Sequence, residues 1–233
     1  MATVSFVRKT VRGIAWILVG FIVSLLAVIL LLRFINPPTS AFMLAYQLTD
    51  SGRALEQEWV PLSDISRWMP LAVVASEDQR FLDHWGVDFA AIRKALTERR
   101  AGDSLRGAST ITQQTAKNLF LWNGRSFVRK GLEAMLALSI DVLWPKKRIL
   151  EVYLNVAEFG RGIYGVESAS RIYFGIPASQ LSPTQAARLA AVLPNPKLLN
   201  AERPSAYVWE RVAWIRGQMA RLSGLPDLEE LYK

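Results

Sequence analysis

The chain of 233 residues contains no cysteine and a single histidine, His84. Disulfide bridges, a cysteine nucleophile and thiolate metal sites are therefore excluded. One histidine also rules out a multi-histidine metal site and argues against a Ser-His-Asp triad. Hydrophobic residues make up 51% of the chain, which excludes intrinsic disorder and provides for one large domain or two small ones.

Several familiar catalytic motifs are missing as well. The sequence has no Gly-rich phosphate loop ending in Lys-Ser or Lys-Thr, no His-Glu-x-x-His pair, and no Ser-x-x-Lys accompanied by Lys-Thr-Gly. Gly160, Gly162 and Gly165 do match Gly-x-Gly-x-x-Gly. They follow a predicted helix rather than a strand, and no acid stands about 20 residues further on, so a dinucleotide site is not indicated. We interpret these glycines as serving a tight turn and close helix packing.

Positive charge is spread unevenly along the chain. The formal net charge is +8, and residues 1–35 contribute half of it because they contain Arg8, Lys9, Arg12 and Arg33 and no acid. The rest of the chain is only mildly basic. This argues against a nucleic-acid partner and leaves room for a local cationic site.

An uncharged run of 20 residues, Gly13 to Leu32, separates Arg12 from Arg33. A helix of this length spans roughly 30 Å, the thickness of a bilayer's hydrocarbon core. A cleaved signal peptide is the alternative, but its apolar region is usually about 7–15 residues and ends at a small-x-small site. We therefore predict a cytoplasmic segment 1–12, an uncleaved transmembrane helix 13–35 and an extracytoplasmic domain 36–233. In a bacterium this is a single-pass anchor in the cytoplasmic (inner) membrane, with the domain in the periplasm.

Beyond Pro37-Pro38 the apolar spacing predicts a mainly α domain. Asp88, Ser109 and Ser182 are expected to cap helices, with Pro183 at the first position of its helix. Alternating strand patterns are scarce, and Glu58 to Leu62 is the best short candidate. The predicted helices are Met69–Gln79, Asp88–Arg100, Ser109–Leu121, Arg125–Leu143, Lys146–Asn155, Ile163–Tyr173, Pro183–Val192 and Ala206–Leu222.

Two polar segments stand out within this helical pattern. In the first, adjacent carboxylates, Glu77 and Asp78, end an apolar helix and precede further charged groups. In the second, a helix beginning near Ser109 places Thr110, Gln113, Gln114 and Lys117 on one side, which suits sugar hydroxyls and a phosphate. The ordinary alternatives are a solvated helix end for the first segment and an amphipathic surface helix for the second.

A third segment pairs two cations, Arg129 and Lys130, with Glu133. An exposed ion pair that adds little to stability would show the same sequence pattern.

The combination of these segments favours one chemistry. A glycosidase needs a carboxylic acid to protonate its leaving group, whereas a diphosphate leaving group needs only cations. One carboxylate can then deprotonate the attacking hydroxyl. The pattern therefore indicates glycosyl transfer from a diphospho-lipid beside a membrane.

The ordered motifs resemble those of glycosyltransferase family 51, the peptidoglycan glycosyltransferases that polymerise lipid II. The resemblance covers roughly residues 50–200 and is closest to the monofunctional members, which lack a penicillin-binding transpeptidase. Its blocks are Glu77-Asp78-x-x-Phe81-x-x-His84-x-Gly86-x-Asp88, Ser109-Thr110-Ile111-x-Gln113-Gln114-x-x-Lys117-Asn118, Arg129-Lys130-x-x-Glu133, Ile149-Leu150-Glu151-x-Tyr153-Leu154-Asn155, Phe159-Gly160-x-Gly162-x-x-Gly165, and Ala169-x-x-x-Tyr173-Phe174-Gly175 with the Leu181 to Pro196 stretch.

The resemblance implies a lysozyme-like fold with a larger head and a small, membrane-associated jaw lobe between Arg99 and Lys130. It implies that Glu77 is the general base for the 4-hydroxyl of incoming lipid II, with inversion and release of undecaprenyl diphosphate. Glu133 is the second expected catalytic residue, orienting the cations or a divalent ion. The expected substrate-binding residues are Asp78, Phe81, His84, Ser109, Thr110, Gln113, Gln114, Lys117, Asn118, Arg129 and Lys130. For His84, the residues themselves favour a structural hydrogen bond over proton transfer.

The resemblance also leaves room for a divalent cation, Mg²⁺ or Mn²⁺, at the diphosphate, and it implies no organic cofactor. Expected partners are lipid II, the growing lipid-linked glycan and the membrane, while cell-wall synthesis or division proteins stay open. Phe120, Leu121, Trp122 and Phe127 either contact lipid or lie in the core. Ala108 and Gln185 depart from the family pattern without touching the proposed chemistry. Two rival functions are a membrane-anchored hydrolase of finished glycan and an inactive assembly protein.

Overall fold

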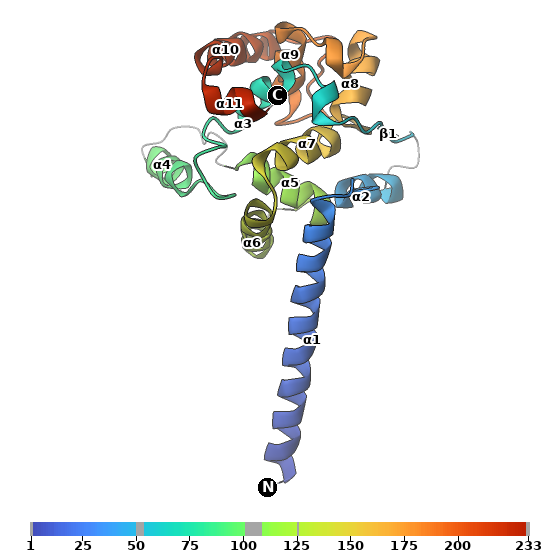
Figure 1. Ribbon diagram of the computed structural model, residues 1–233, viewed down its shortest axis with the longest axis vertical. Helices are drawn as coiled ribbons and strands as arrows, with labels where there is room; N and C mark the ends of the chain where they lie inside the picture. The colour runs from blue at the N-terminus through green and yellow to red at the C-terminus, as the bar shows by residue number, and fades with distance from the viewer. Residues whose placement is uncertain (1, 50–53, 101–108, 125, 232–233) are drawn as a thin grey trace. The chain divides into compact units, whose positions relative to one another are not determined.

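The computed structural model describes residues 2–49, 54–100, 109–124 and 126–231 (Figure 1). The side chains of residues 2–7, 94, 96, 98–100 and 227 are outside the description. The chain divides into two compact units, Met1–Pro37 and Pro38–Lys233. The second unit holds every residue that the sequence singled out for chemistry.

The first unit is one long helix, α1 (Ala2–Leu32). Its Arg8–Leu32 segment contains an 18-residue window with a mean hydropathy of 3.0 and is long and apolar enough to cross a membrane. The helix ends three residues before the predicted boundary at residue 35. Arg33 and Phe34 form a turn instead, because the approaching Pro37-Pro38 pair disfavours helical backbone. Residues 2–12, predicted as a separate segment, belong to the same helix.

The second unit is mainly α, as predicted. Its helices are α2 (Ala41–Thr49), α3 (Trp68–Glu77), α4 (Phe89–Arg100), α5 (Ile111–Phe120), α6 (Phe127–Leu143), α7 (Lys146–Val156), α8 (Val166–Phe174), α9 (Pro183–Val192), α10 (Ala206–Leu222) and α11 (Pro226–Leu231), with single 3₁₀ turns η1 (Leu62–Asp64) and η2 (Ala178–Gln180). In Figure 1, α3, α9 and α10 pack together at one end, and α5 packs against α6 and α7 at the other. The predicted helices are confirmed to within a few residues, apart from α8, and residue 125 lies outside the description.

A small sheet of three strands connects the helices. Its order is β1 (Glu56–Gln57), β3 (Ile163–Tyr164), β2 (Glu158–Gly160), with β1 parallel and β2 antiparallel to β3. The turn from β2 to β3 carries the glycine motif. Gly162 and Gly165 have φ of +79° and +81°, a left-handed region that other residues avoid. The interpretation of these glycines as turn residues is therefore confirmed.

Two local predictions were wrong. Residues 58–62 do not form a strand, because the buried side chain of Asn155 takes both backbone groups of Val60, with N···O distances of 2.9 Å each. A side chain of α7 thus replaces the neighbouring strand. The helix predicted from Ile163 begins instead at Val166, because Ile163 and Tyr164 pair with β2 and the left-handed Gly165 interrupts the backbone.

The helix caps match the predicted residues with one exception. Ser182 accepts a hydrogen bond from the Gln185 N–H, and Asp88 accepts one from the Ala91 N–H. Thr110 rather than Ser109 caps α5, in a reciprocal capping box with Gln113. The aromatic segment before α6 divides between core and surface. Leu121 is buried and Phe120 half-buried, whereas Trp122 and Phe127 are 54% and 98% exposed.

Among the glycines that the structure describes, Gly86 is the one whose replacement by alanine meets backbone atoms most closely. Its φ is +71°, and an added Cβ would lie 2.5 Å from the backbone oxygen of Ala137. We expect Gly86→Ala to lower the free energy of unfolding by about 3 kcal/mol, from backbone strain and the clash together. Denaturant unfolding followed by circular dichroism measures this loss.

Gly175→Ala is the matched control. Gly175 has a similar φ of +68°, but an added Cβ there meets no atom within 4 Å. Its replacement should cost only the strain, about 1–2 kcal/mol. Equal losses for the two variants would contradict the steric argument at Gly86.

Candidate active site

The two adjacent carboxylates at the end of α3 have different surroundings. Glu77 is the last residue of the helix, and the backbone leaves the helical conformation at Asp78, with φ of −160° and ψ of 75°. The side chain of Asp78 is buried and accepts hydrogen bonds from His84 Nε2 at 2.9 Å and from the Ile111 N–H at 3.0 Å. Glu77 is half-buried and accepts a hydrogen bond from Gln114 Nε2 at 2.8 Å. Asp78 is therefore held inside the protein while Glu77 reaches the site.

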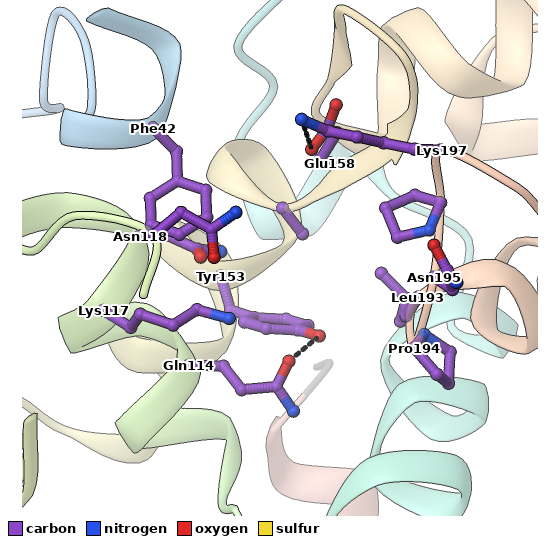
Figure 2. Close-up of a pocket in the computed structure, with 13 residues that line it drawn as sticks. Phe42, Gln114, Lys117, Asn118, Tyr153, Glu158, Leu193, Pro194, Asn195 and Lys197 are labelled. Atoms are coloured by element: carbon purple, nitrogen blue, oxygen red, sulfur yellow. Dashed lines mark hydrogen bonds and ion pairs between the residues drawn. The ribbon is translucent and has the colours of Figure 1, made fainter. Parts of the chain in front are cut away.

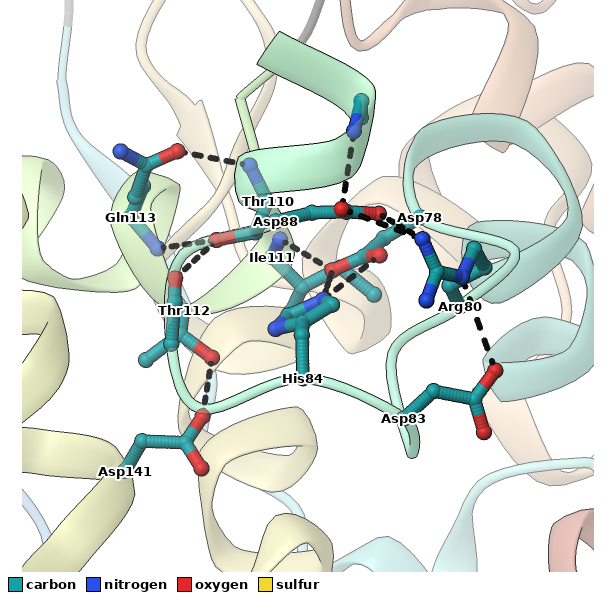
Figure 3. Close-up of polar contacts among 12 residues, drawn as sticks. Asp78, Arg80, Asp83, His84, Asp88, Thr110, Ile111, Thr112, Gln113 and Asp141 are labelled. Carbon is teal, nitrogen blue, oxygen red and sulfur yellow. Dashed lines mark hydrogen bonds and ion pairs between the residues drawn. The ribbon is translucent and has the colours of Figure 1, made fainter. Parts of the chain in front are cut away.

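The Asp78 contacts belong to a larger polar network (Figure 3). Thr110 Oγ1 donates to the Gly86 carbonyl at 2.5 Å, and Lys146 Nζ donates to the His84 carbonyl at 2.7 Å. The ring of Phe81 is fully buried and lies 4.7 Å from the Lys146 ammonium. These bonds join the end of α3, the 84–88 loop and the start of α5. The network therefore fixes where Glu77 stands relative to α5.

The exposed face of α5 lines an open cavity of about 220 Å³. Figure 2 shows Gln114, Lys117 and Asn118 on one wall, with the segment Leu193–Lys197 on the opposite wall. The Lys117 ammonium lies 5.3 Å from the centre of the Phe42 ring. Ile111, Thr115 and Leu119 are buried on the other side of α5. The helix thus presents amide and ammonium groups to a space large enough for part of a sugar chain.

Gln114 connects Glu77 to a buried tyrosine. Tyr153 of α7 donates its hydroxyl hydrogen to Gln114 Oε1 at 3.2 Å, as Figure 2 shows. Because a hydroxyl donates to the amide oxygen, the amide NH₂ is left to face Glu77. Tyr153 belongs to one of the motif blocks but is not among the predicted site residues. No local signal could have found it, because the contact joins α5 and α7.

Arg129, Lys130 and Glu133 form a second cluster beside α5. Glu133 is 2% exposed, and its carboxylate accepts hydrogen bonds from Arg129 Nη1 at 2.7 Å and from Lys130 Nζ. Lys130 Nζ also donates to Ser109 Oγ at 2.8 Å, which ties α6 to the start of α5. Arg129 Nε donates to the Gly124 carbonyl at 2.7 Å. Arg129 and Glu133 thus form a buried ion pair, with the partly exposed Lys130 as its second cation, rather than the solvated surface pair that the sequence left open.

Electrostatic effects connect Glu77 with the charges of Arg129, Lys130 and Glu133. Burial raises the pKa of Glu77, while Gln114, Arg211 and Lys117 each lower it. Burial lowers the pKa of Lys117, and Glu133 is the largest opposing influence. The charges of Arg129, Lys130 and Glu77 also affect the pKa of Lys117, so these five charged groups act within one site. Three cations against two carboxylates leave this site with a positive balance, which favours an anionic ligand.

The predicted site residues therefore divide into two sets. Gln114, Lys117 and Asn118 line the cavity, and Glu77 is hydrogen-bonded to Gln114. The hydrogen-bonded cluster of the 109–133 region contains Ser109, Arg129, Lys130 and Glu133. The remaining predicted residues are buried in the supporting network, namely Asp78, Phe81, His84, Thr110 and Gln113. Their buried contacts indicate support of the cleft rather than direct contact with a substrate, in line with the structural hydrogen bond favoured for His84. The catalytic and binding roles themselves stay predictions.

The donor set of the described residues does not fit a metal ion held by the protein. No group of three or more His, Asp or Glu side chains in the described part of the chain could hold one. Glu133 is the carboxylate among the cations, and its two oxygens already accept from Arg129 and Lys130. Mg²⁺ commonly binds through one or two carboxylates together with substrate phosphates, so a phosphate would have to supply most of the ligands.

The family model described as Transglycosylase matches residues 45–220. The chain belongs to this family. It is 56% identical to a biosynthetic peptidoglycan transglycosylase of Marinomonas sp. (strain MWYL1) over 92% of this chain and 91% of that relative. A relative of the same name from Pseudomonas entomophila (strain L48) is 48% identical over 97% and 96% of the two chains. One from Shewanella frigidimarina (strain NCIMB 400) is 57% identical over 82% of each.

The protein is therefore a peptidoglycan glycosyltransferase with a mainly helical, lysozyme-like domain. The family resemblance read from the motif blocks is confirmed, because the matched range contains all of them. The inactive assembly protein loses its support.

Glu133→Gln tests the charged cluster. We expect it to lower the free energy of unfolding by about 3 kcal/mol, because the variant leaves the buried Arg129 without its carboxylate. The pKa of Lys117 should also fall further, since its main opposing influence is removed. Urea unfolding measures the first effect, and NMR titration of methylated lysines measures the second. Glu210→Gln, at an exposed position, is the control that should leave both unchanged.

Proposed function

We propose that this glycosyltransferase polymerises lipid II into uncrosslinked glycan strands, with Glu77 as the general base. The observation that carries the proposal is the position of the Glu77 carboxylate. It accepts a hydrogen bond from Gln114 and is electrostatically coupled to Lys117, and both of these residues line the cavity. A base and a diphosphate-binding group are thus adjacent.

In the proposed step, the 4-hydroxyl oxygen of the acceptor lipid II attacks the anomeric carbon of the growing chain's last sugar. The new C–O bond forms on the face opposite the diphosphate, so the configuration at that carbon inverts. The bond to the diphosphate oxygen breaks, and undecaprenyl diphosphate leaves with the bonding electrons. The hydroxyl proton passes to Glu77, which accounts for every atom.

The leaving group explains the cations. A diphosphate departs as an anion and needs charge stabilisation rather than a proton. Lys117, Arg129 and Lys130 provide this charge, and Glu133 holds the last two in place through its buried carboxylate. A hydrolase acting on finished glycan would gain nothing from three cations beside its catalytic carboxylate, which favours the transferase.

Any divalent cation, Mg²⁺ or Mn²⁺, would on this proposal enter with the diphosphate of the substrate. The protein's own share would be to neutralise the diphosphate with Lys117, Arg129 and Lys130. No organic cofactor is needed, because the diphosphate of the substrate is itself the activated leaving group.

A membrane location agrees with two features of the chain. The Arg8–Leu32 segment can span a bilayer, and basic residues before it favour a cytoplasmic N-terminus and a periplasmic domain. Within the second unit, one side of α6 exposes Phe127, Val128, Met135, Leu138 and Val142. We propose that Trp122, Phe127 and Val128 are the membrane-associated part of the jaw predicted between Arg99 and Lys130, and that the apolar side of α6 extends this membrane contact beyond it.

Glu77→Gln should keep the fold and lower the rate of polymerisation by about 10²–10⁴, the usual contribution of a general base. The assay incubates detergent-solubilised protein with lipid II and resolves glycan products by size. Retention of more than about a tenth of the rate would exclude Glu77 as the base. Release of fragments from isolated cell wall, without polymer, would instead support the hydrolase.

The pH dependence of the polymerisation rate gives a second test of Glu77 as the base. Glu77 must be ionised to act as a base, so the rate should fall as the pH drops through its pKa. Because burial raises that pKa, the fall should come at a higher pH than for an ordinary glutamate. Gln114→Met removes a hydrogen bond to the carboxylate, and it should move the acid limb to a still higher pH.

The apolar side of α6 predicts membrane binding without the anchor. A chain lacking residues 1–35 should stay folded and still sediment with lipid vesicles. In this chain, Phe127→Ser should weaken vesicle binding about tenfold, since a fully exposed aromatic ring loses its place in the bilayer. Leu198→Ser, 79% exposed outside α6, is the matched control and should have no effect. Equal losses would contradict the assignment.

A further inference from the structure

One side of α10 borders the catalytic carboxylate and has no part in the steps above. Arg211, Trp214 and Gln218 follow one another at spacings of three and four residues, which places them on the same side of the helix. Gln218 Oε1 accepts a hydrogen bond from Gln79 Nε2 at 3.3 Å, two residues beyond Glu77. Arg211 acts on the Glu77 carboxylate electrostatically. This side of α10 therefore lies next to the end of α3.

The orientation of α10 is fixed by its packing. Val208, Val212, Ile215 and Met219 are buried, and the helix packs against α3 and α9. Arg211 Nε donates to the backbone carbonyl of Ala191 at 3.3 Å, at the end of α9. The Arg211–Gln218 side is thus a fixed surface beside the site rather than a mobile appendage.

The donor and the acceptor cannot approach Glu77 from the same direction. On the proposed function, the donor's diphosphate lies against Lys117, Arg129 and Lys130, all of which belong to α5 and α6. The acceptor must bring its 4-hydroxyl to Glu77 from another side. The α10 surface borders Glu77 and carries none of these cations, so it can form a wall of the acceptor site.

Trp214 is the residue on this surface suited to a sugar. Its side chain is 43% exposed, between a guanidinium and an amide on the same side of α10. A pyranose ring presents an apolar C–H face with hydroxyl groups at its rim. A flat indole flanked by Arg211 and Gln218 matches this pattern, since the ring can cover the apolar face while the flanking groups meet the hydroxyls.

We propose that Trp214 stacks on a sugar ring of the acceptor and so positions the acceptor's 4-hydroxyl at Glu77. Arg211 and Gln218 border the same subsite. This inference rests on the proposed function, and it adds a binding residue from a helix that lies outside the motif blocks of the sequence.

The test separates acceptor from donor. The donor is a lipid-linked disaccharide diphosphate whose 4-hydroxyl is methylated, so that it can only donate. The acceptor is the unmethylated disaccharide, with its 4-hydroxyl free, joined to its lipid through an ether that cannot leave. With full-length protein in detergent, Trp214→Leu should raise the KM for the acceptor about three- to tenfold, the value of one aromatic contact. The KM for the donor and kcat should stay close to those of the wild type.

Two further variants make the result specific. Trp214→Phe keeps an aromatic face and should restore most of the acceptor affinity. Trp209→Leu replaces a tryptophan of similar exposure, 46%, on the side of α10 that meets Arg188 of α9, and it should change neither KM. An unchanged acceptor KM in Trp214→Leu, a shift in the donor KM instead, or an equal shift in Trp209→Leu would overturn the proposal. Failure of the wild type to join the pair would overturn the proposed function itself.

Discussion

The buried carboxylate of Asp78 is the contact on which the rest of the site depends. It accepts hydrogen bonds from the side chain of His84 and from the backbone of Ile111, and so joins the end of α3 to the start of α5. Glu77 precedes it in the chain, and Gln114 lies one turn into α5. Because both ends are fixed at Asp78, Gln114 meets Glu77 at hydrogen-bonding distance. A buried carboxylate with two partners is costly to rearrange, which keeps this geometry stable.

Burial disfavours the charged forms of Glu77 and Lys117, and this suits the proposed chemistry. Glu77 is held in surroundings that raise its pKa, and Lys117 in surroundings that lower its pKa. The charged form of each group is therefore less stable here than it would be in water. An anionic substrate that neutralises Lys117, and a hydroxyl that gives its proton to Glu77, both relieve this cost. Glu133 is different, because two cations satisfy its buried carboxylate.

The motif blocks predicted the family and the helices that carry the polar residues, whereas the burial of individual side chains needed the structure. Thr110 and Gln113 share the polar pattern of α5 with Gln114 and Lys117, yet they cap the helix and are buried. Spacing alone cannot separate them, because a capping box uses the same hydroxyl and amide groups that bind sugars. Residues 58–62 have the alternation of a strand, but Asn155 satisfies their backbone from α7. A side-chain partner 95 residues away leaves no trace in a local pattern.

The sequence by itself determined the helical class, the apolar N-terminal segment and the family, and it predicted Glu77 and the three cations as site residues. These follow from periodicity, from a long uncharged run and from ordered motifs, all of which are local along the chain. Only the tertiary structure decided that Tyr153 orients Gln114, that Glu133 is buried between Arg129 and Lys130, and that Gln218 of α10 meets the end of Glu77's helix. Such facts depend on which helix faces meet, and this is set by the packing of α3, α5, α7 and α10 rather than by any one segment.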